Sequence, residues 1–232
     1  MVYLSYLRDR RADMAMCEDY VQIQDYMTGL VPERPAEMQE MERYAAEVDF
    51  PIIGPVAGYY CYQVALMNKA RSVFEMGSGY GYSTAWFALA VKENCEKEPG
   101  KPGIVHHVVW DADLSQSARV HLKKMGLDQL VEFHVAEAIQ TLRNTNDQFD
   151  LIFCDINKDS YPDALEIIHE KLRPGGVLII DNMIWSGQIF DENDQSAPTR
   201  GVREFTRRIS TNPDWIMSLS PLRDGVIVAI KK

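Results

Sequence analysis

The sequence predicts an α/β fold, and three observations lead to this class. From residue 71 onward, short apolar runs alternate with longer amphipathic stretches, as strands and helices do in βαβ units. The chain ends instead in two apolar runs around a turn, which indicates an antiparallel hairpin. The residues before 71 carry helical signals only. We therefore expect a helical extension over residues 1–70 and one α/β domain over residues 71–232, together forming one structural unit.

The N-terminal extension contains two predicted helices. Apolar residues keep near-helical spacing over residues 38–48, after Pro35. A second helical stretch covers about residues 55–70. Residues 50–55 (FPIIGP) join the two, and their prolines and glycine predict an extended connector.

The alternation after residue 70 places each element of the predicted sheet. Predicted strands cover Ser72–Met76, Val105–Trp110, Val131–Val135, Phe149–Cys154 and Val177–Ile180. Predicted helices cover Ser83–Asn94, Leu114–Met125, Glu137–Leu142 and Tyr161–Leu172. Strands separated by such crossover helices form a mostly parallel sheet with helices on both faces. The final runs, Trp215–Leu219 and Val226–Ile230, flank Asp224-Gly225, so at least one strand near the sheet edge should be antiparallel.

Charge and apolar content exclude two classes of partner. With 24 Lys and Arg against 34 Asp and Glu, the formal net charge is −10, which argues against a nucleic-acid-binding surface built on bulk charge. The one tight basic cluster near a terminus, Arg8, Arg10 and Arg11, is predicted to be a solvated helix face. Apolar runs such as residues 85–91 fall far short of the roughly 20 residues that a membrane span needs.

The N-terminus and the cysteines indicate the compartment. No apolar segment followed by small residues opens the chain, so no secretory signal is predicted. Cys17, Cys61, Cys95 and Cys154 form no C-x-x-C pair, and reduced thiols are expected. We therefore expect a cytoplasmic protein.

A glycine-rich turn joins the first predicted strand to the following helix. It contains Glu75, Gly77, Gly79, Gly81 and Ser83. Glycines let the backbone turn tightly and approach a ligand, and the helix N-terminus offers free N–H groups. The spacing G-x-G-x-G differs from the G-x-G-x-x-G of dinucleotide sites. Because Glu75 would repel a pyrophosphate, a ligand with hydroxyls and a positive centre fits this turn better.

Acids end three of the predicted strands, where ligands bind in open parallel sheets. Asp111 is suited to hold the hydroxyls of a ribose, or to cap the next helix. Asp155 and the pair Asp181-Asn182 end two later strands, and as neighbours they would offer three oxygen ligands to a hard cation such as Mg²⁺ or Ca²⁺. Helix capping is the alternative for both of these acids. Lys158 follows Asp155 by three residues and is a candidate general base.

The histidines carry little signal. His106, His107 and His134 fall on predicted strands and His121 and His169 on predicted helices, and no pair has the sequence spacing of metal ligands. We expect them to be structural or exposed. The chain also contains no G-x-S-x-G elbow and no C-x-x-C zinc pattern.

Taken together, these residues resemble the cation-dependent O-methyltransferases, the group of caffeoyl-CoA and catechol O-methyltransferases and their bacterial relatives. The resemblance covers about residues 35–232 and rests on the order in which its sequence motifs occur. These are Glu75-x-Gly77-x-x-x-Gly81-Tyr82-Ser83, Asp111, Asp155-x-x-Lys158-x-x-Tyr161, Asp181-Asn182 with Trp185 and Gly187, and the turn Leu222-Arg223-Asp224-Gly225. It implies the seven-stranded, Rossmann-like sheet of S-adenosylmethionine-dependent methyltransferases, with the last strand antiparallel.

The resemblance also implies a role for each of these residues. The S-adenosylmethionine pocket would be lined by Glu75, Gly77, Gly81, Ser83, Asp111 at the ribose, Ala138 near the adenine, and Asp155. The ligands of a divalent cation, with Mg²⁺ as the first expectation and Ca²⁺ or Mn²⁺ as alternatives, would be Asp155, Asp181 and Asn182. Lys158 would be the catalytic base, and the substrate contacts would be Tyr161 and Trp185. A homodimer is implied as well.

The chain departs from the family pattern in three places. Glu137-Ala138 stands where the family often has Asp-Ala, and residues 155–158 read D-I-N-K where many members have D-x-D-K. The glutamate that contacts substrate in the animal catechol enzyme has no convincing counterpart in residues 188–199. The implied activity is metal-dependent transfer of a methyl group from S-adenosylmethionine to a hydroxyl of a catechol-like small molecule. Residues 185–200 are polar and follow a predicted metal-binding strand end, so we expect a substrate-recognition loop there. A metal-independent methyltransferase, an NAD-dependent dehydrogenase and a non-catalytic binding protein are the alternatives.

Overall fold

The computed structural model describes residues 22–100 and 102–232. The chain divides into two compact units, Met1–Arg34 and Pro35–Lys232. In the first unit, residues 22–30 are helical, while the basic cluster at residues 8–11 and Cys17 lie outside the described residues. In the described part of the chain, no helix combines the length and the apolar character that a bilayer crossing needs.

Helices and strands alternate in the second unit in the predicted order. The helices are α2 Ala36–Val48, α3 Gly54–Met67, α4 Tyr82–Lys97, α5 Ala112–Lys124, α6 Ala138–Asn144, α7 Tyr161–Lys171 and α8 Ala197–Thr211. The strands are β1 Ser72–Met76, β2 Ile104–Val109, β3 Val131–Val135, β4 Phe149–Cys154, β5 Leu172–Ile180, β6 Trp215–Ser220 and β7 Val226–Lys231. Short 3-10 helices are η2 Asp128–Leu130, η3 Lys158–Ser160 and η4 Trp185–Phe190. Strand β5 begins earlier than predicted, at Leu172 rather than at Val177.

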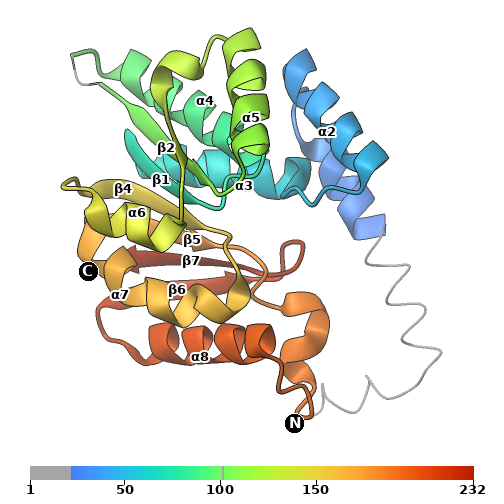
Figure 1. The fold of residues 1–232 in the computed structure, drawn as a ribbon, viewed down its shortest axis with the longest axis vertical. Helices are drawn as coiled ribbons and strands as arrows, with labels where there is room; N and C mark the ends of the chain where they lie inside the picture. Colours follow the sequence, from blue (N-terminus) through green and yellow to red (C-terminus); the bar gives the residue numbers. More distant parts are fainter. Residues whose placement is uncertain (1–21, 101) are drawn as a thin grey trace. The chain divides into compact units, whose positions relative to one another are not determined.

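The strands form one seven-stranded sheet in the order β3-β2-β1-β4-β5-β7-β6 (Figure 1). Parallel pairs join β3, β2, β1, β4 and β5. Strand β7 runs antiparallel to both β5 and β6. The predicted fold, a mostly parallel sheet with an antiparallel hairpin at its C-terminal edge, is confirmed. The chain moves outward in opposite directions from β1 and β4, and ligands bind beside such a switch point.

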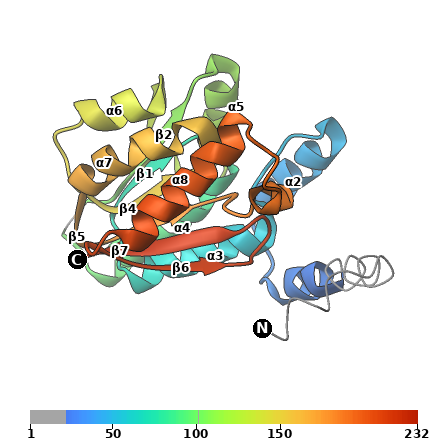
Figure 2. The same cartoon turned by 90° about the horizontal axis from the view of Figure 1, so that it is seen from below.

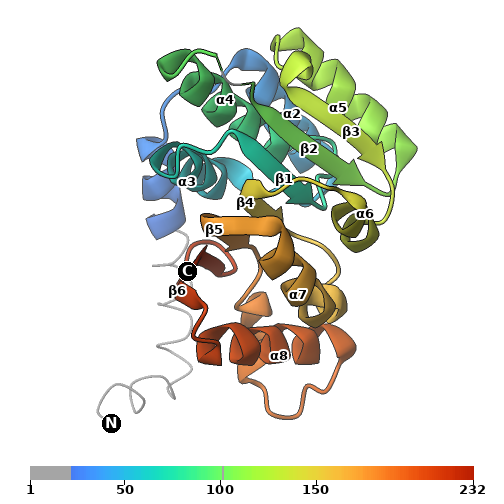
Figure 3. The same cartoon turned by 90° about the vertical axis from the view of Figure 1, so that its left-hand side faces the viewer.

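Helices cover both faces of the sheet (Figures 2 and 3). On the face under α6, α7 and α8, Phe74, Ile152 and Leu178 are fully buried in one hydrophobic cluster. On the opposite face, Phe87 of α4 packs on Phe153, with 5.4 Å between ring centroids. Because the central strands are covered on both sides, their sequences are nearly continuous apolar runs.

Helix α8 is the main element that the sequence analysis missed. A loop is predicted over residues 185–200, but η4 and the first turn of α8 lie inside it. Pro198 occupies that first turn, where its missing N–H removes no helical hydrogen bond. Val202, Phe205 and Ile209 are spaced three and four residues apart and are buried. This spacing among polar residues is the apolar stripe of an amphipathic helix, so the sequence carries a helix signal here that was not used.

Candidate active site

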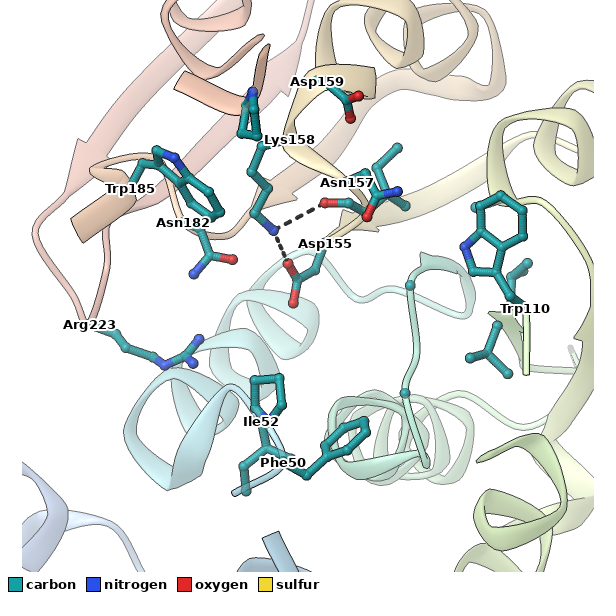
Figure 4. A pocket seen from close by; sticks show the side chains of 18 of the residues that line it. Phe50, Ile52, Trp110, Asp155, Asn157, Lys158, Asp159, Asn182, Trp185 and Arg223 are labelled. Carbon is teal, nitrogen blue, oxygen red and sulfur yellow. Dashed lines mark hydrogen bonds and ion pairs between the residues drawn. The ribbon is translucent and has the colours of Figure 1, made fainter. Parts of the chain in front are cut away.

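A cavity of about 680 Å³ opens at the carboxyl ends of β1, β2, β4 and β5. Asp155, Lys158, Asn182 and Arg223 gather on one side of it, and Trp110 lies on the other (Figure 4). The volume is in the range of small-molecule sites, and the position is the sheet edge that the sequence predicts for ligand binding. We call the charged side of this cavity the acidic end.

The turn after β1 brings the backbone against the end of β4. Gly77 has a φ of 88°, and a Cβ there would lie 2.2 Å from the carbonyl oxygen of Asp155. Gly81, at the start of α4, has a φ of 93°, and its Cβ would lie 2.8 Å from that of Ala118. Both positions therefore require glycine. Gly77 lines the cavity and Ser83 lines a smaller adjoining pocket, whereas Gly81 serves the turn by packing on α5.

Glu75 is buried behind the turn and does not line the cavity. The Thr84 hydroxyl donates to Glu75 Oε2 and lies within hydrogen-bond distance, 3.0 Å, of His107 Nδ1. Burial raises the pKa of Glu75, and burial also lowers the pKa of His107 to about 3, so this histidine is neutral. Among the described residues, Glu75 Oε1 has no hydrogen-bond partner. A buried carboxylate oxygen without a partner is costly, so a bound water or ligand group is expected to satisfy it.

Asp111 acts as the cap of α5. Its Oδ1 accepts hydrogen bonds from the N–H groups of Asp113 at 2.8 Å and Leu114 at 3.0 Å. Asp111 is exposed and lies beside the cavity without lining it, so its contact with a ribose stays a prediction. Ala138 does line the cavity, and so does Trp110, which is 67% exposed.

The acidic end brings the three predicted metal ligands together. Asp155 and Asn182 line the cavity, and Asp181 lies beneath with only 1% of its surface exposed. The structure also places a cation beside each carboxylate. Lys158 Nζ donates to Asp155 Oδ1 at 2.6 Å, and Arg223 donates to Asp181 Oδ2 at 2.6 Å.

The two carboxylates of the acidic end repel each other. Burial, and then the neighbouring Asp155 carboxylate, raises the pKa of Asp181 to about 6, against the opposing effect of Arg223. A divalent cation would relieve this repulsion. Two carboxylates and the amide oxygen of Asn182 are the oxygen ligands that Mg²⁺, Ca²⁺ and Mn²⁺ accept, so the donor set fits a hard cation.

Aromatic rings and α8 hold Lys158 in place. Its Nζ lies 5.1 Å from the ring centroid of Tyr161 and 5.9 Å from that of Trp185. A Cβ at Gly201 of α8 would lie 2.1 Å from the Lys158 carbonyl oxygen, so α8 touches the main chain here. Trp185 lines the cavity, and its contact with substrate stays a prediction. Tyr161 is fully buried and donates its hydroxyl to the carbonyl of Asp181 at 2.9 Å, so it supports the acidic end from behind and is not placed to contact substrate.

The segment after β5 is fixed through its main chain. Asn182, Trp185 and Ser186 adopt positive φ values of 60°, 52° and 50°, which are strained for residues other than glycine. Arg203 of α8 donates to four main-chain carbonyls within residues 188–194. A single arginine therefore sets the path of most of this segment.

Several residues of the cavity wall escaped prediction. Phe50 and Ile52 belong to the connector before α3, and their apolar side chains in a proline-rich segment were the only available signal. Arg223 has a φ of 53° in a turn where glycine would be favoured. That conflict between a residue and its backbone is the feature that points to function.

Outside the cavity, two histidines that are far apart in the sequence meet in space. His106 and His134 lie on neighbouring strands, and their nearest ring nitrogens are 3.1 Å apart. The Glu132 side chain completes a group of three potential metal ligands. Sequence spacing could not show this, because the register of β2 against β3 creates the contact.

The comparison with known families decides the class of this protein. A family model described as O-methyltransferase matches residues 37–232. The chain belongs to the O-methyltransferase family. A catechol O-methyltransferase of Niastella koreensis is 27% identical over 198 residues, which are 81% of this chain and 86% of that protein. A catechol O-methyltransferase of Mycobacterium tuberculosis is 29% identical over 66% of each chain.

Solved structures agree with this membership. The O-methyltransferase TomG of Streptomyces achromogenes, in complex with S-adenosylmethionine, has 25% identity and a TM-score of 0.77, covering 91% of this chain and 96% of its own. An O-methyltransferase of Bacillus cereus, in complex with S-adenosylhomocysteine, shares the fold with 23% identity and a TM-score of 0.79, over 91% of this chain and 97% of its own. The protein is therefore an S-adenosylmethionine-dependent O-methyltransferase, as the resemblance implied, and not a dehydrogenase or a non-catalytic binding protein.

Proposed function

We propose that this enzyme transfers the methyl group of S-adenosylmethionine to a hydroxyl of a catechol-like small molecule, with the help of a divalent cation. The observation that carries the proposal is the acidic end of the cavity. The Asp155 carboxylate, the Asn182 amide and the Lys158 amine of that end line the same cavity as the glycine turn at Gly77. A methyl donor, an acceptor hydroxyl and a cation would meet in this one cavity.

The glycine side of the cavity suits the methyl donor. S-adenosylmethionine supplies an electrophilic methyl group on a positively charged sulfur. Gly77 and Ala138 leave room beside the strand ends because they carry little or no side chain. Trp110 offers an exposed ring on which an adenine would stack. Next to Trp110, Asp111 accepts both capping hydrogen bonds on Oδ1, so neither of them uses Oδ2. We assign the ribose contact to this carboxylate.

The acidic end suits the cation and the acceptor. Asp155, Asp181 and Asn182 would hold the ion, with Mg²⁺ as the first candidate and Ca²⁺ or Mn²⁺ as alternatives. When bound, a divalent cation lowers the pKa of the hydroxyls that it contacts, which a phenol with a pKa of about 10 needs at neutral pH. Two adjacent hydroxyls form a chelating pair, and for this reason we propose a catechol-like acceptor.

Lys158, in its neutral amine form, would take the proton of the acceptor hydroxyl. Its side chain is only 10% exposed, and its amine is held at the cavity wall beside Asp155. The rings of Tyr161 and Trp185 limit where that amine can move. General-base catalysis of this kind is worth about 10²–10⁴-fold, and the remainder of the rate enhancement comes from holding donor and acceptor in line.

A metal-independent methyltransferase is the second candidate, and one observation favours it. Lys158 and Arg223 already place a positive charge beside each carboxylate of the acidic end. Those carboxylates are thereby partly neutralised by the protein itself. Metal dependence of the reaction distinguishes the two candidates.

A methyl-transfer assay tests the proposal. The purified protein is incubated with S-adenosylmethionine, Mg²⁺ and a vicinal dihydroxy aromatic such as caffeate, and the methylated product is measured with and without a chelator. We expect product that the chelator abolishes and added Mg²⁺ restores. Product formation that is indifferent to the chelator would support the metal-independent candidate. Absence of product with every vicinal diol tried would overturn the substrate class.

A pair of variants localises the metal ligands. Asp155→Ala should abolish turnover while S-adenosylmethionine binding, measured by calorimetry, is largely retained. Asp159→Ala is the matched control, because this exposed acid lines the same cavity a few residues away. It should keep turnover within a few-fold of the wild type. Equal losses in the two variants would argue for a general charge effect and against a specific ligand.

The quaternary structure and location implied by the resemblance are part of the same proposal. We expect a cytoplasmic homodimer. Sedimentation velocity on the full chain tests the oligomeric state, and a monomer at working concentrations would contradict it.

A further inference from the structure

A group of metal-ligating side chains lies on the sheet, apart from the cavity described above. It consists of His106 on β2 with Glu132 and His134 on β3, and none of the three lines that cavity. His106 Nδ1 lies 3.1 Å from His134 Nε2. The Glu132 carboxylate approaches to 3.9 Å from His106 Nδ1 and 3.5 Å from His134 Nε2. The three ligand atoms all lie within 4.8 Å of one another.

Strand register and packing fix this group. His106 pairs with Glu132 across the two parallel strands, and His134 follows two residues later on the same face of β3. The His106 ring is buried between Phe74 and Phe149, with centroid distances of 5.7 Å and 5.2 Å. His134 is half-buried and Glu132 is exposed, so an ion would have access from the solvent side.

We propose that His106, Glu132 and His134 form a binding site for a transition-metal ion of the Zn²⁺ type. Two imidazoles and a carboxylate are Zn²⁺ ligands, and a water would complete a tetrahedral shell. Two nitrogens on one tetrahedral Zn²⁺ lie about 3.3 Å apart at Zn–N distances of about 2.0–2.1 Å. The observed separation of 3.1 Å is close to this value. Mg²⁺ and Ca²⁺, which prefer oxygen ligands, are not expected here.

The contacts within the group favour a metal. A single hydrogen bond can join His106 Nδ1 and His134 Nε2. The Glu132 carboxylate lies near both of these nitrogens, and the three side chains supply two nitrogens and one oxygen around one point. A bound cation would satisfy all three side chains together.

An ion at this position would act on the edge of the sheet. Among the described strands, β3 is the last on its side of the sheet and pairs with β2 alone. The metal would connect the two strands through side chains in addition to their backbone ladder. Because the site exists only in the folded protein, Zn²⁺ should raise the unfolding temperature by mass action.

Calorimetric titration of the full chain with Zn²⁺ tests the site, in a buffer with excess Mg²⁺ to occupy the acidic end. We expect one tight Zn²⁺ equivalent. His134→Gln and Glu132→Gln should each weaken it by more than about tenfold, the lower end of the range that even outer-shell changes produce. The matched control is His169→Gln, a part-exposed histidine on α7 that lies 3.6 Å from Asp214, and it should bind as the wild type does.

Cobalt spectra give a second readout. Co²⁺ bound to the wild type should show the strong visible absorption of a tetrahedral ion, and His134→Gln should lose it. Equal Zn²⁺ affinity in the wild type and both group variants would overturn the site, and so would a loss of binding in His169→Gln. Both group positions are at least partly exposed, so the variants should fold and should keep methyl transfer measured without Zn²⁺. A negative result here therefore leaves the proposed methyl-transfer function unaffected.

Discussion

Asp150 and Asp181 stand at opposite ends of the sheet, and each is bonded to an arginine. Arg173 donates to Asp150 Oδ1 at 2.5 Å, and Arg223 donates to Asp181 Oδ2 at 2.6 Å. Although both acids have an arginine partner, the pKa of Asp150 is lowered, whereas the pKa of Asp181 is raised to about 6. An arginine partner alone therefore does not decide whether a carboxylate stabilises the fold.

The surroundings of each acid explain the difference. Burial raises the pKa of Asp150, but the hydrogen bond from Arg173 and those from the backbone N–H groups of Arg71 and Ser72 outweigh it. At the other end, burial is deeper and the carboxylate of Asp155 adds repulsion. The amino end of the sheet is arranged for stability. The carboxyl end holds charge at a cost in stability, as functional sites do.

Among the three variants that test this comparison, Lys158→Met should have the largest effect. If this amine is the general base, kcat should fall by about 10²–10⁴-fold while S-adenosylmethionine affinity is retained. The matched control is Lys171→Met, because Lys171 donates to the Thr145 carbonyl on the far side of the domain. Rates are measured under saturating substrate. An unchanged rate in Lys158→Met would mean that another group takes the proton.

Asp150→Asn should lower the free energy of unfolding by about 2–3 kcal/mol at neutral pH, since it removes charged hydrogen bonds. Its Oδ2 accepts from two backbone N–H groups, and its Oδ1 accepts from Arg173. In asparagine one of these two oxygens becomes an NH₂ group, which cannot accept a hydrogen bond, so one of the two sets of hydrogen bonds is lost. Urea denaturation measures the change, with the exposed Asp128→Asn as control. If Asp150→Asn loses no more stability than Asp128→Asn, the Asp150 carboxylate does not stabilise the amino end of the sheet.

The pH dependence of that loss has a definite sign. The folded-state pKa of Asp150 lies below the ordinary value of 3.8, so its stabilisation is complete above 3.8 and is lost as the pH falls through the folded-state pKa. The difference between wild type and Asp150→Asn should therefore stay constant near neutral pH and shrink below about pH 3.8. A difference that persists in strong acid would show that packing is responsible.

Asp181→Asn should have the smallest effect on stability and the opposite sign. The pKa of Asp181 is raised from 3.8 to about 6, so the native state loses stability as the pH rises through this window, and an amide does not ionise. We expect a gain of about 1–2 kcal/mol at neutral pH, less than the full shift because Arg223 loses its partner, together with loss of Mg²⁺-dependent turnover. Urea denaturation at pH 4 and pH 7 measures it. A loss of stability as large as that of Asp150→Asn would contradict the difference between the two ends of the sheet.

Much of this architecture was predictable because strand signals are local. Strand β4, Phe149–Cys154, is an apolar run between breakers, and the structure confirms its bounds. Once the strands were ordered, topology alone placed Asp155 and Asp181 at one edge of the sheet. The predicted site was therefore a consequence of where strands end.

The rest depends on contacts that sequence spacing does not encode. Arg223 and Phe50 reach the cavity from segments more than 100 residues from each other. Both roles of Asp111 are compatible with the same sequence position, and only the structure shows the capping bonds. His106 and His134 meet because of strand register, which local patterns leave open.

Arg203 has a consequence for how freely the segment after β5 can change in sequence. It holds residues 188–194 through carbonyl oxygens, which every amino acid possesses. Side chains in that segment can therefore be exchanged while the path of its main chain is preserved. Relatives that retain such an arginine would be able to accept point substitutions there without rebuilding the loop.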